Sequence, residues 1–418
     1  MLAIAKPVKN LFGDWAYHSS RFERVIDQLR SRGDLPLRLV LWNGRRFDLS
    51  TTPTVTIVIP QPSAIRYFLA PDLAKLGEAF VEGHIRVEGS INDVFRIGAE
   101  LVGRLVGDAD TRTSRSAWHS RSIDRAAIEY HYDVSNDFYA LFLDRNMAYS
   151  CAYYRNQSDS LDLAQEQKLD YILGKLMLKP GDRFLDIGCG WGALIFRAVS
   201  KFGATAKGIT LSRNQFDYVR ERIRAEGLEG RCEVELCDYR DLAESERFDK
   251  IASVGMFEHV GLRNLQTYFR KIHSVLLDGG LVLNHGITAS DPDSRWVAMG
   301  GGEFIDRYVF PQGELAHISL VLREMAIAGF EVVDIESLRR HYAKTCAEWA
   351  DRLAAHRERA LATAGERCVR IWEIYLAGCA FGFQRSWMNV YQILGCKADG
   401  GNSLPMTRDY MYDSALLR

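Results

Sequence analysis

From about Asp182 to Thr288, short apolar segments alternate with longer segments in which apolar residues recur at helical spacing. The short segments predict strands: RFLDIG, TAKGIT, CEVELCD, FDKIASVG and GLVLNHGIT. The longer segments predict helices: WGALIFRAVSKFG, RNQFDYVRERIRAEG and a third from about Leu265 to Leu277. Buried strands separated by amphipathic helices favour an α/β fold, a parallel sheet with helices on both faces. Ligands of such folds bind at the carboxyl ends of the strands.

Residues 1–108 have a different pattern, which predicts a small α+β domain. The segments LRLVLWNG and TVTIVIP are rich in β-branched residues, end in turn formers and predict strands. Helical spacing follows in PDLAKLGEAFVEG and again from about Ile91 to Leu105. Residues 109–129 are polar and aperiodic, which is typical of a linker. We therefore assign residues 130–418 to a second, larger domain.

The composition is that of a globular protein. The 418 residues are 47% apolar and 26% charged, and this length predicts two or three domains. A net charge of −1 does not indicate a nucleic-acid-binding protein. Residues 1–10 lack the features of a signal peptide, and no apolar run reaches the about 18 residues of a membrane span. Eight scattered cysteines form no disulfide framework, so we expect the reducing cytoplasm.

The N-terminal part is nevertheless mildly basic. The first 50 residues contain nine Lys or Arg and five Asp or Glu. Two interpretations are open. The basic residues form a solvated face, as charged residues commonly do, or they contact anionic lipid headgroups at roughly 1 kcal/mol per residue.

The segment FLDIGCGWGAL indicates a cofactor site. Asp186 ends a strand, and Gly188, Gly190 and Gly192 form the turn into a helix, where small residues let a ligand approach the backbone. Such a turn is also found in dinucleotide sites. The G-x-G-x-G spacing after an aspartate resembles motif I of class I S-adenosylmethionine methyltransferases. That resemblance implies that the amino-acid end of the cofactor lies over this turn.

The next two strand ends supply further candidate cofactor contacts. A nicotinamide enzyme would have an acid at the end of the second strand, and many methyltransferases do too, but this strand ends in Thr210. Gln215 is either an exposed helix residue or a ribose ligand through its amide. Asp238 and Tyr239, after the third strand, are candidates for hydrogen bonding and ring contact with adenine.

Three other segments are unusually polar or aromatic. Residues 130–154 contain six tyrosines and two phenylalanines, and aromatic faces stabilise cations such as a sulfonium or a carbocation. Glu258 and His259 follow the fourth strand and are either a structural pair or part of a site. His285, in LVLNH, is either a satisfied core group or a site residue. The spacings typical of metal ligands are missing, so we predict no metal site.

Together these segments resemble cyclopropane-fatty-acyl-phospholipid synthases. The matching segments occur in the family's order: HYDVSNDFY, YSCAYY, LDIGCGWG, GITLSRNQ, FEHVG, NHGIT and FIDRYVFPQGEL. The resemblance runs from about Tyr130 to the C-terminus. LGEAFVEGHIRVEG also resembles the extra N-terminal domain of the bacterial phospholipid enzymes. The resemblance implies that a class I methyltransferase sheet of Rossmann-like topology follows this small domain in the sequence.

The resemblance also implies a reaction. The methyl group of S-adenosylmethionine adds to the cis double bond of an unsaturated phospholipid acyl chain, and a base removes a proton so that a cyclopropane ring closes. The family uses a bound bicarbonate ion as that base. Its ligands carry over to Cys151, Glu258, His285, the backbone at Ile287, and Tyr342. We expect a shared proton or hydrogen bond where Glu258 meets the anion.

Other roles carry over in the same way. The residues expected to contact the cofactor are Tyr149, Ser150, Gly188, Gly190, Thr210, Leu211 and Gln215. His259 is expected to support the anion site, and Tyr132 to stabilise the cation near the reacting carbons. Cys379 matches a cysteine of the family. A nucleophile is unnecessary, because the methyl group moves directly to carbon, so we expect Cys379 to pack as a small apolar residue.

Three alternative functions stay open at this point. Loss of a different proton from the carbocation would give a methyl- or methylene-branched fatty acid. A lipid-binding protein with an inactive methyltransferase fold would carry damaged motifs, and none is seen. A small-molecule methyltransferase would not need the N-terminal domain. The leading interpretation predicts a homodimer that binds peripherally to the inner face of the membrane.

Overall fold

The computed structural model describes residues 11–106, 135–292, 301–310, 313–402 and 404–412. The predicted linker, residues 109–129, and Tyr132 lie outside the described residues. Chain packing divides the described part into two compact units. Residues 11–106, 301–305 and 366–378 form the first, and the rest form the second.

The first unit contains a small sheet with helices. Its strands are β1 (Leu37–Leu41), β2 (Arg46–Asp48), β3 (Val55–Ile59) and β4 (Arg86–Glu88), in the spatial order β2-β1-β3-β4 within the described chain. β1 and β3 run parallel, and the two outer pairs are antiparallel. In β1 and β3 every second residue is buried, so one face of the sheet packs on a core.

The helices of the first unit follow amphipathic segments. They are α1 (Leu11–Ser31), η1 (Pro62–Ile65), α2 (Arg66–Leu69), α3 (Leu73–Val81) and α4 (Ile91–Val106). α3 begins at Asp72, whose carboxylate caps the backbone N–H of Lys75, and the chain turns at Gly83, where φ is +74°. The predicted α+β character of this region is therefore observed.

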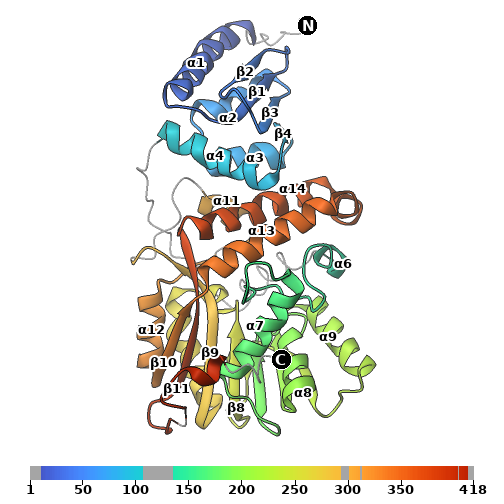
Figure 1. Ribbon diagram of the computed structural model, residues 1–418, viewed down its shortest axis with the longest axis vertical. Helices are drawn as coiled ribbons and strands as arrows, with labels where there is room; N and C mark the ends of the chain where they lie inside the picture. Colours follow the sequence, from blue (N-terminus) through green and yellow to red (C-terminus); the bar gives the residue numbers. More distant parts are fainter. Residues whose placement is uncertain (1–10, 107–134, 293–300, 311–312, 403, 413–418) are drawn as a thin grey trace, which may run out of the picture. The chain divides into compact units, whose positions relative to one another are not determined.

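The second unit is built on a larger sheet (Figure 1). In the described chain the spatial order is β10-β11-β9-β8-β5-β6-β7. Its strands are β5 (Arg183–Ile187), β6 (Thr205–Thr210), β7 (Cys232–Leu236), β8 (Phe248–Val254), β9 (Leu276–Ala289), β10 (Phe330–Ser337) and β11 (Met388–Lys397). Strands β5 to β9 pair in parallel, and β11 runs antiparallel between β9 and β10.

Neighbouring residues of a strand belong to different cores. Phe184 packs in the core that contains α7 (Leu161–Lys175), α8 (Ala193–Phe202) and α9 (Arg213–Ala225). Leu185 packs in the core that contains α10 (Leu265–Val275) and α12 (Ile318–Ile327). The predicted α/β sheet with helices on both faces is confirmed.

The remaining elements that the structure describes complete the two units. They are α6 (Asn136–Tyr139), η2 (Tyr239–Asp241), η3 (Phe257–His259), η4 (Leu262–Asn264), α11 (Gly301–Tyr308), α13 (Arg339–Ala355), α14 (Arg357–Gln384) and η5 (Asp409–Tyr412). None of the described helices is long and apolar enough to cross a membrane.

Candidate active site

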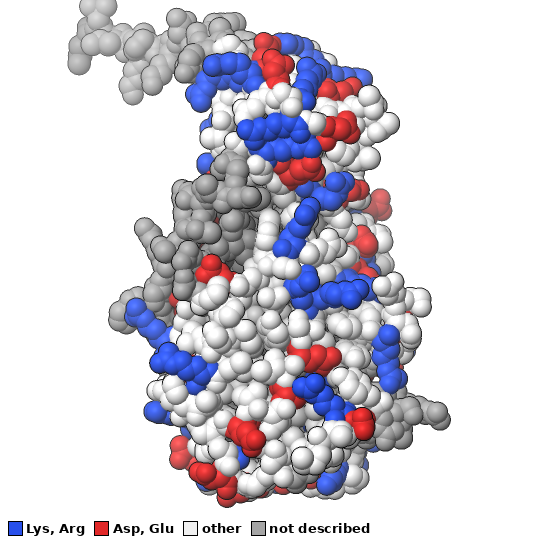
Figure 2. Space-filling view, turned by 60° about the vertical axis from the view of Figure 1, so that its left-hand side comes forward, with Lys and Arg blue, Asp and Glu red and all other residues white. Residues whose placement is uncertain are grey.

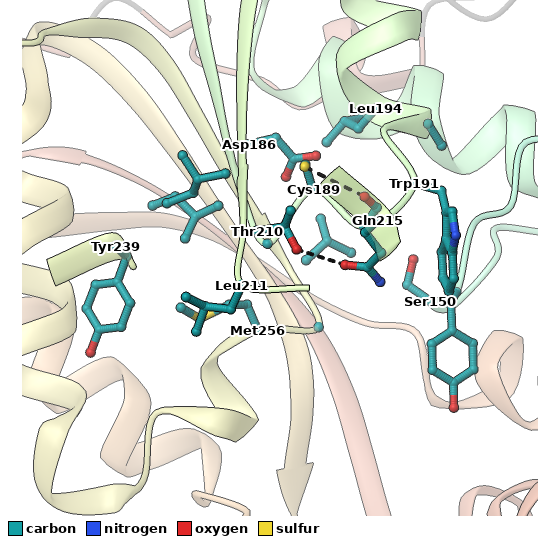
Figure 3. Close-up of a pocket in the computed structure, with 18 of the residues that line it drawn as sticks. Ser150, Asp186, Cys189, Trp191, Leu194, Thr210, Leu211, Gln215, Tyr239 and Met256 are labelled. Atoms are coloured by element: carbon teal, nitrogen blue, oxygen red, sulfur yellow. Dashed lines mark hydrogen bonds between the residues drawn. The ribbon is translucent and has the colours of Figure 1, made fainter. Parts of the chain in front are cut away.

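A pocket lies where β5, β6, β7 and β8 end at their carboxyl termini (Figure 3). All ten residues predicted to contact a cofactor line it: Tyr149, Ser150, Asp186, Gly188, Gly190, Thr210, Leu211, Gln215, Asp238 and Tyr239. The rule that ligands bind at the strand ends of α/β sheets therefore located this pocket from the sequence.

The glycine turn is shaped by backbone conformations that favour glycine. Gly188, Gly190 and Gly192 have φ values of +81°, +55° and +84°. A Cβ on Gly192 would lie 2.7 Å from the ring of Phe196, so this glycine allows the turn to pack on α8. A Cβ on Gly190 would meet no atom within 4 Å among the described residues, so this glycine borders open space.

Asp186 is a buried carboxylate with unused hydrogen-bonding capacity. Its side chain is 3% exposed, and its Oδ1 has no hydrogen-bond partner among the described residues. Burial raises the pKa of Asp186 to about 7, and the nearby charge of Lys168 opposes that rise. A buried carboxylate that lacks a partner is suited to bind a cationic ligand group.

Gln215 is buried rather than exposed, although it lies in the first turn of α9. The Thr210 hydroxyl donates to Oε1 of Gln215 at 2.8 Å, and Figure 3 shows this bond at the centre of the pocket. Ser212 caps the same helix, since its hydroxyl accepts from the backbone N–H of Gln215. The bond from Thr210 fixes the orientation of the Gln215 side-chain amide, so that its Nε2 group can donate to a ligand.

Asp238 and Tyr239 line the pocket but are held by protein groups. The Arg240 guanidinium donates to both carboxylate oxygens of Asp238, at 2.8 and 2.6 Å. The Tyr239 ring is 6% exposed and packs edge-on against Tyr268, with ring centroids 5.3 Å apart. The pocket wall therefore contains an ion pair where adenine contacts were predicted.

Several pocket residues were missed by the sequence reasoning. They include Lys168, Trp191 and Met256. Lys168 lies on α7 and is 3% exposed. The sequence around it, between Gln167 and Leu169, predicts a helix residue that faces solvent. No sequence signal distinguishes it, because its burial depends on how α7 packs.

Aromatic rings in mutual contact extend from the glycine turn to Tyr342. Centroid distances are 4.8 Å from Trp191 to Tyr139, 5.6 Å from Tyr139 to Tyr149 and 5.2 Å from Tyr149 to Trp349. Trp349 then lies 6.0 Å from Tyr342. The aromatic segment singled out in the sequence thus supplies Tyr139 and Tyr149 to this series, which begins at the cofactor turn.

Glu258 and Ile287 are brought together at the end of the parallel strands. The backbone N–H of Gly255 donates to the carbonyl of His285 at 2.8 Å, and two residues further along β9 the N–H of Ile287 donates to Oε1 of Glu258 at 2.6 Å. The Glu258 carboxylate therefore accepts a hydrogen bond from the β9 backbone at a position beyond the end of β8. Burial raises the pKa of Glu258 to about 7, and the bond from Ile287 opposes that rise.

His285 lies on the same face of β9 as Ile287 and is 2% exposed. The side-chain amide nitrogen of Gln392, on β11, lies 3.3 Å from Nδ1 of His285. With that amide as donor, Nδ1 accepts, and the proton of the neutral ring lies on Nε2. Burial lowers the pKa of His285 to about 3, so the ring stays neutral. Nε2 of His285 and Oε2 of Glu258 are both buried, and neither has a hydrogen-bond partner in the described part of the chain.

Cys151, Tyr342 and Cys379 form a second group. Burial raises the pKa of Tyr342 well above its usual value, and the Cys151 and Cys379 thiols contribute to that rise. The Cys151 sulfur lies 3.3 Å from the carbonyl of Ala152 and 3.8 Å from that of Leu338. The Leu338 N–H donates to the carbonyl of Val390, which faces Ile287 across the β9–β11 pair. Strand β11 therefore connects this group to Glu258 and His285.

His259 lines the cofactor pocket, and its ring lies 5.2 Å from the ring of Phe310. Its expected support of the anion site stays a prediction. Cys379 is 9% exposed, and its thiol adds to the rise in the pKa of Tyr342.

Comparison with known proteins gives consistent matches. Residues 119–393 match the sequence model of the mycolic acid cyclopropane synthetase family, and residues 26–105 match a domain of unknown function. A probable fatty acid methyltransferase of Pseudomonas putida is 49% identical, over 90% of this chain and 96% of its own length. The tuberculostearic acid methyltransferase UfaA1 of Mycobacterium tuberculosis is 34% identical, over 87% of this chain and 88% of its own.

A solved structure agrees with these sequence matches. The mycolic acid cyclopropane synthase CmaA1, in complex with S-adenosylhomocysteine (SAH), is 36% identical with a TM-score of 0.62, over 65% of this chain and 98% of its own. The sheet, the glycine turn and the pocket define a class I S-adenosylmethionine-dependent methyltransferase. Within that class, the chain belongs to the mycolic acid cyclopropane synthetase family.

The pocket residues fit S-adenosylmethionine. Asp186 suits the α-ammonium group of the cofactor, the turn at Gly190 leaves its backbone accessible, and the Gln215 amide is oriented to donate to a ribose hydroxyl. When bound, the cofactor supplies an electrophilic methyl group.

Proposed function

We propose that this protein methylates the cis double bond of an unsaturated phospholipid acyl chain and closes a cyclopropane ring, with bicarbonate as the base. The observation that carries this proposal is that two buried atoms, Nε2 of His285 on β9 and Oε2 of Glu258 on η3, have no hydrogen-bond partner among the described residues. A buried polar atom without a protein partner calls for an explanation, and a bound ion or water that completes its hydrogen bonding is one.

The chemistry of these groups suits a small oxyanion. The neutral His285 ring offers an N–H donor, and Tyr342 offers a hydroxyl that its raised pKa keeps protonated. Glu258 would repel an anion when ionised. With a pKa of about 7, however, its carboxyl is partly protonated at neutral pH and can share that proton with the anion. Bicarbonate, when bound, would supply a base for the proton that must leave before the ring closes.

The aromatic series contributes to the same reaction. Tyr149 lines the cofactor pocket, and its half-buried ring contacts the buried rings of Tyr139 and Trp349. Aromatic faces attract cations without acting as nucleophiles, so they stabilise a sulfonium or a carbocation without being methylated. A buried aromatic wall also excludes water, which would otherwise trap a carbocation.

The acceptor is proposed to be reached at a membrane surface on the cytoplasmic side. The first unit exposes Arg21, Arg24, Arg32 and Arg46. Figure 2 shows blue basic side chains at its top, with acidic ones between them. Some basic residues are neutralised, since Arg38 pairs with Asp48 and Arg45 with Glu23. The attraction to anionic headgroups is therefore moderate and salt-dependent. The homodimer expected from the family stays a prediction.

A second candidate outcome is a methyl- or methylene-branched acyl chain. The specific observation in its favour is that two relatives matching nearly the whole chain bear the names probable fatty acid methyltransferase and tuberculostearic acid methyltransferase. Both outcomes share the methyl transfer and differ in which proton leaves afterwards.

Product analysis tests the proposal and separates the two outcomes. The purified protein is incubated with S-adenosylmethionine, bicarbonate and vesicles of unsaturated phospholipid, and the fatty acids are examined by mass spectrometry and proton NMR. The proposal predicts a gain of one CH₂ with upfield ring protons. Vinylic or methyl-branch signals without ring protons would show that the product is the branched chain of the second candidate. The absence of any mass gain would contradict both.

A further inference from the structure

Lys168 is a buried cation in the wall of the cofactor pocket. It lies on α7 with its side chain 3% exposed, and its Nζ donates to the hydroxyl of Ser150 at 2.8 Å. Burial lowers the pKa of Lys168, while Asp144, Cys151 and Asp186 oppose that effect. Because a buried ammonium group is costly unless it is paired, its position beside a ligand pocket requires an explanation.

Two residues of α7, one turn apart, hold the same segment of chain. The Gln165 side-chain amide donates to the carbonyls of Ala148 and Ser150, at 3.2 and 2.9 Å. Gln165 therefore anchors the backbone of this segment, whereas Lys168 contacts the Ser150 side chain. Since the backbone is already held, the bond from Lys168 adds little to its position and acts mainly on the hydroxyl.

That bond sets the direction of the Ser150 hydroxyl. A protonated lysine can only donate, so the Ser150 oxygen accepts, and its own proton is directed elsewhere. Figure 3 shows Ser150 between Trp191 and Gln215, on the opposite side of the pocket from Tyr239. A hydroxyl that accepts from an ammonium is a strengthened donor, which suits a negatively charged ligand group.

The pocket thus contains two opposite charges. Asp186, with its unpartnered Oδ1, suits an ammonium group, and the Lys168–Ser150 pair suits a carboxylate. The amino-acid end of S-adenosylmethionine carries both. We propose that Lys168 is a positioning residue that acts through Ser150 to recognise the α-carboxylate of the cofactor. This inference rests on the cofactor of the proposed function and is independent of the lipid acceptor.

The test compares two ligands by calorimetry. SAH carries the carboxylate and the amine, and decarboxylated SAH keeps only the amine. In the Lys168→Met variant we expect the affinity for SAH to fall about tenfold or more, while the affinity for the decarboxylated ligand changes by less than about twofold. Ser150→Ala should show the same selectivity, and the double variant should lose little more than Lys168→Met, because the two residues act as one unit.

The matched control is Lys201→Met, which removes a partly buried lysine of the same unit that pairs with the buried Asp170, away from the pocket lining. Both ligands should bind this variant as they bind the wild type. Equal losses for the two ligands in Lys168→Met would overturn the inference, because they would indicate a structural role. Unchanged SAH affinity would overturn it as well. If the wild type failed to bind SAH, the proposed function would fail with it.

Discussion

Two carboxyl groups of the active site owe their chemistry to burial. Asp186 and Glu258 are 3% and 8% exposed, and each has a pKa raised to about 7. An exposed carboxyl group would be fully ionised at about pH 7. Here each group is close to half protonated at neutral pH, so small changes in surroundings decide its charge. In the proposed function the two groups differ in role through their ligands, an ammonium group for Asp186 and an anion for Glu258.

Cofactor binding should depend on pH through Asp186. The ionised carboxylate binds the ammonium group of SAH, so the affinity should fall as the pH is lowered below about 7 and level off above it. Calorimetry from pH 5.5 to 8.5 measures this directly. Asp186→Asn should bind SAH weakly and with little pH dependence. A wild-type affinity that is constant over this range would contradict the assignment.

The same pKa shift predicts an effect on stability. Because the folded-state pKa of Asp186 is raised, its contribution to stability is fully present at low pH, below the ordinary Asp pKa, and is lost as the pH rises through about 7. In the absence of ligand, Asp186→Asn should therefore raise the thermal midpoint at pH 8 more than at pH 5. Equal shifts at the two pH values, measured by calorimetric unfolding, would contradict the burial argument.

Glu258→Gln tests the shared proton. An amide can still accept from the Ile287 N–H and donate to an anion, but it cannot exchange a proton with one. Turnover should fall by about 100-fold or more, while SAH affinity stays within about twofold. Glu314→Gln is the matched control, since Glu314 is also buried and accepts from a backbone N–H, that of Leu262. Normal turnover in Glu258→Gln would remove Glu258 from the mechanism.

At the scale of elements, the site depends on the close approach of η3 to β9. A Cβ on Gly286 would lie 2.0 Å from the ring of Phe257 and 3.1 Å from Oε2 of Glu258. Phe257 is 2% exposed, so its ring has little room to move. A glycine at position 286 is therefore what allows Glu258 to reach the backbone of β9.

Gly286→Ala should displace Glu258 and destabilise the sheet edge. We expect a loss of about 1–3 kcal/mol in unfolding free energy and a fall in turnover larger than that loss explains. Denaturant unfolding and product formation measure the two effects. Gly98→Ala is the control, because a Cβ at that position meets no atom within 4 Å among the described residues. A Gly286→Ala variant with normal stability and turnover would contradict the described packing.

The sequence predicted the elements with regular patterns and missed residues whose role depends on packing. The strands that contain Asp186, Thr210 and His285 were predicted, because buried apolar runs end where these polar residues begin. Lys168 could not be identified, since a lysine in a polar helix is exposed unless other chain segments cover it. The ion pair between Asp238 and Arg240 likewise depends on side-chain conformations that no pattern encodes.

At the scale of the whole molecule, the chain combines a methyltransferase unit with a smaller unit that exposes several arginines. The cofactor pocket and the proposed anion site both lie in the larger unit, where they share the sheet formed by β5, β8 and β9. The smaller unit exposes arginines on α1, on β2 and in the chain between them. We therefore expect the two units to divide the work, with chemistry in one and contact with lipid headgroups in the other.

Vesicle binding tests that division. Full-length protein should cosediment with vesicles that contain anionic phospholipid, and binding should weaken as salt is raised. Substituting both Arg24 and Arg46 with Gln should reduce binding by up to about 30-fold, at about 1 kcal/mol per charge. Arg220 and Arg224, exposed on α9 of the larger unit, provide the control pair. Equal losses for the two double variants would show that charge alone, and not the smaller unit, determines binding.

The dependence of turnover on bicarbonate tests the central claim most directly. The initial rate on unsaturated phospholipid vesicles is measured in buffer freed of carbon dioxide, with bicarbonate then added back in steps. If Glu258, His285 and Tyr342 hold the base, the rate should be low without bicarbonate and rise to saturation as it is added, and Glu258→Gln should not recover. A wild-type rate that is the same with and without bicarbonate would contradict this account of the active site.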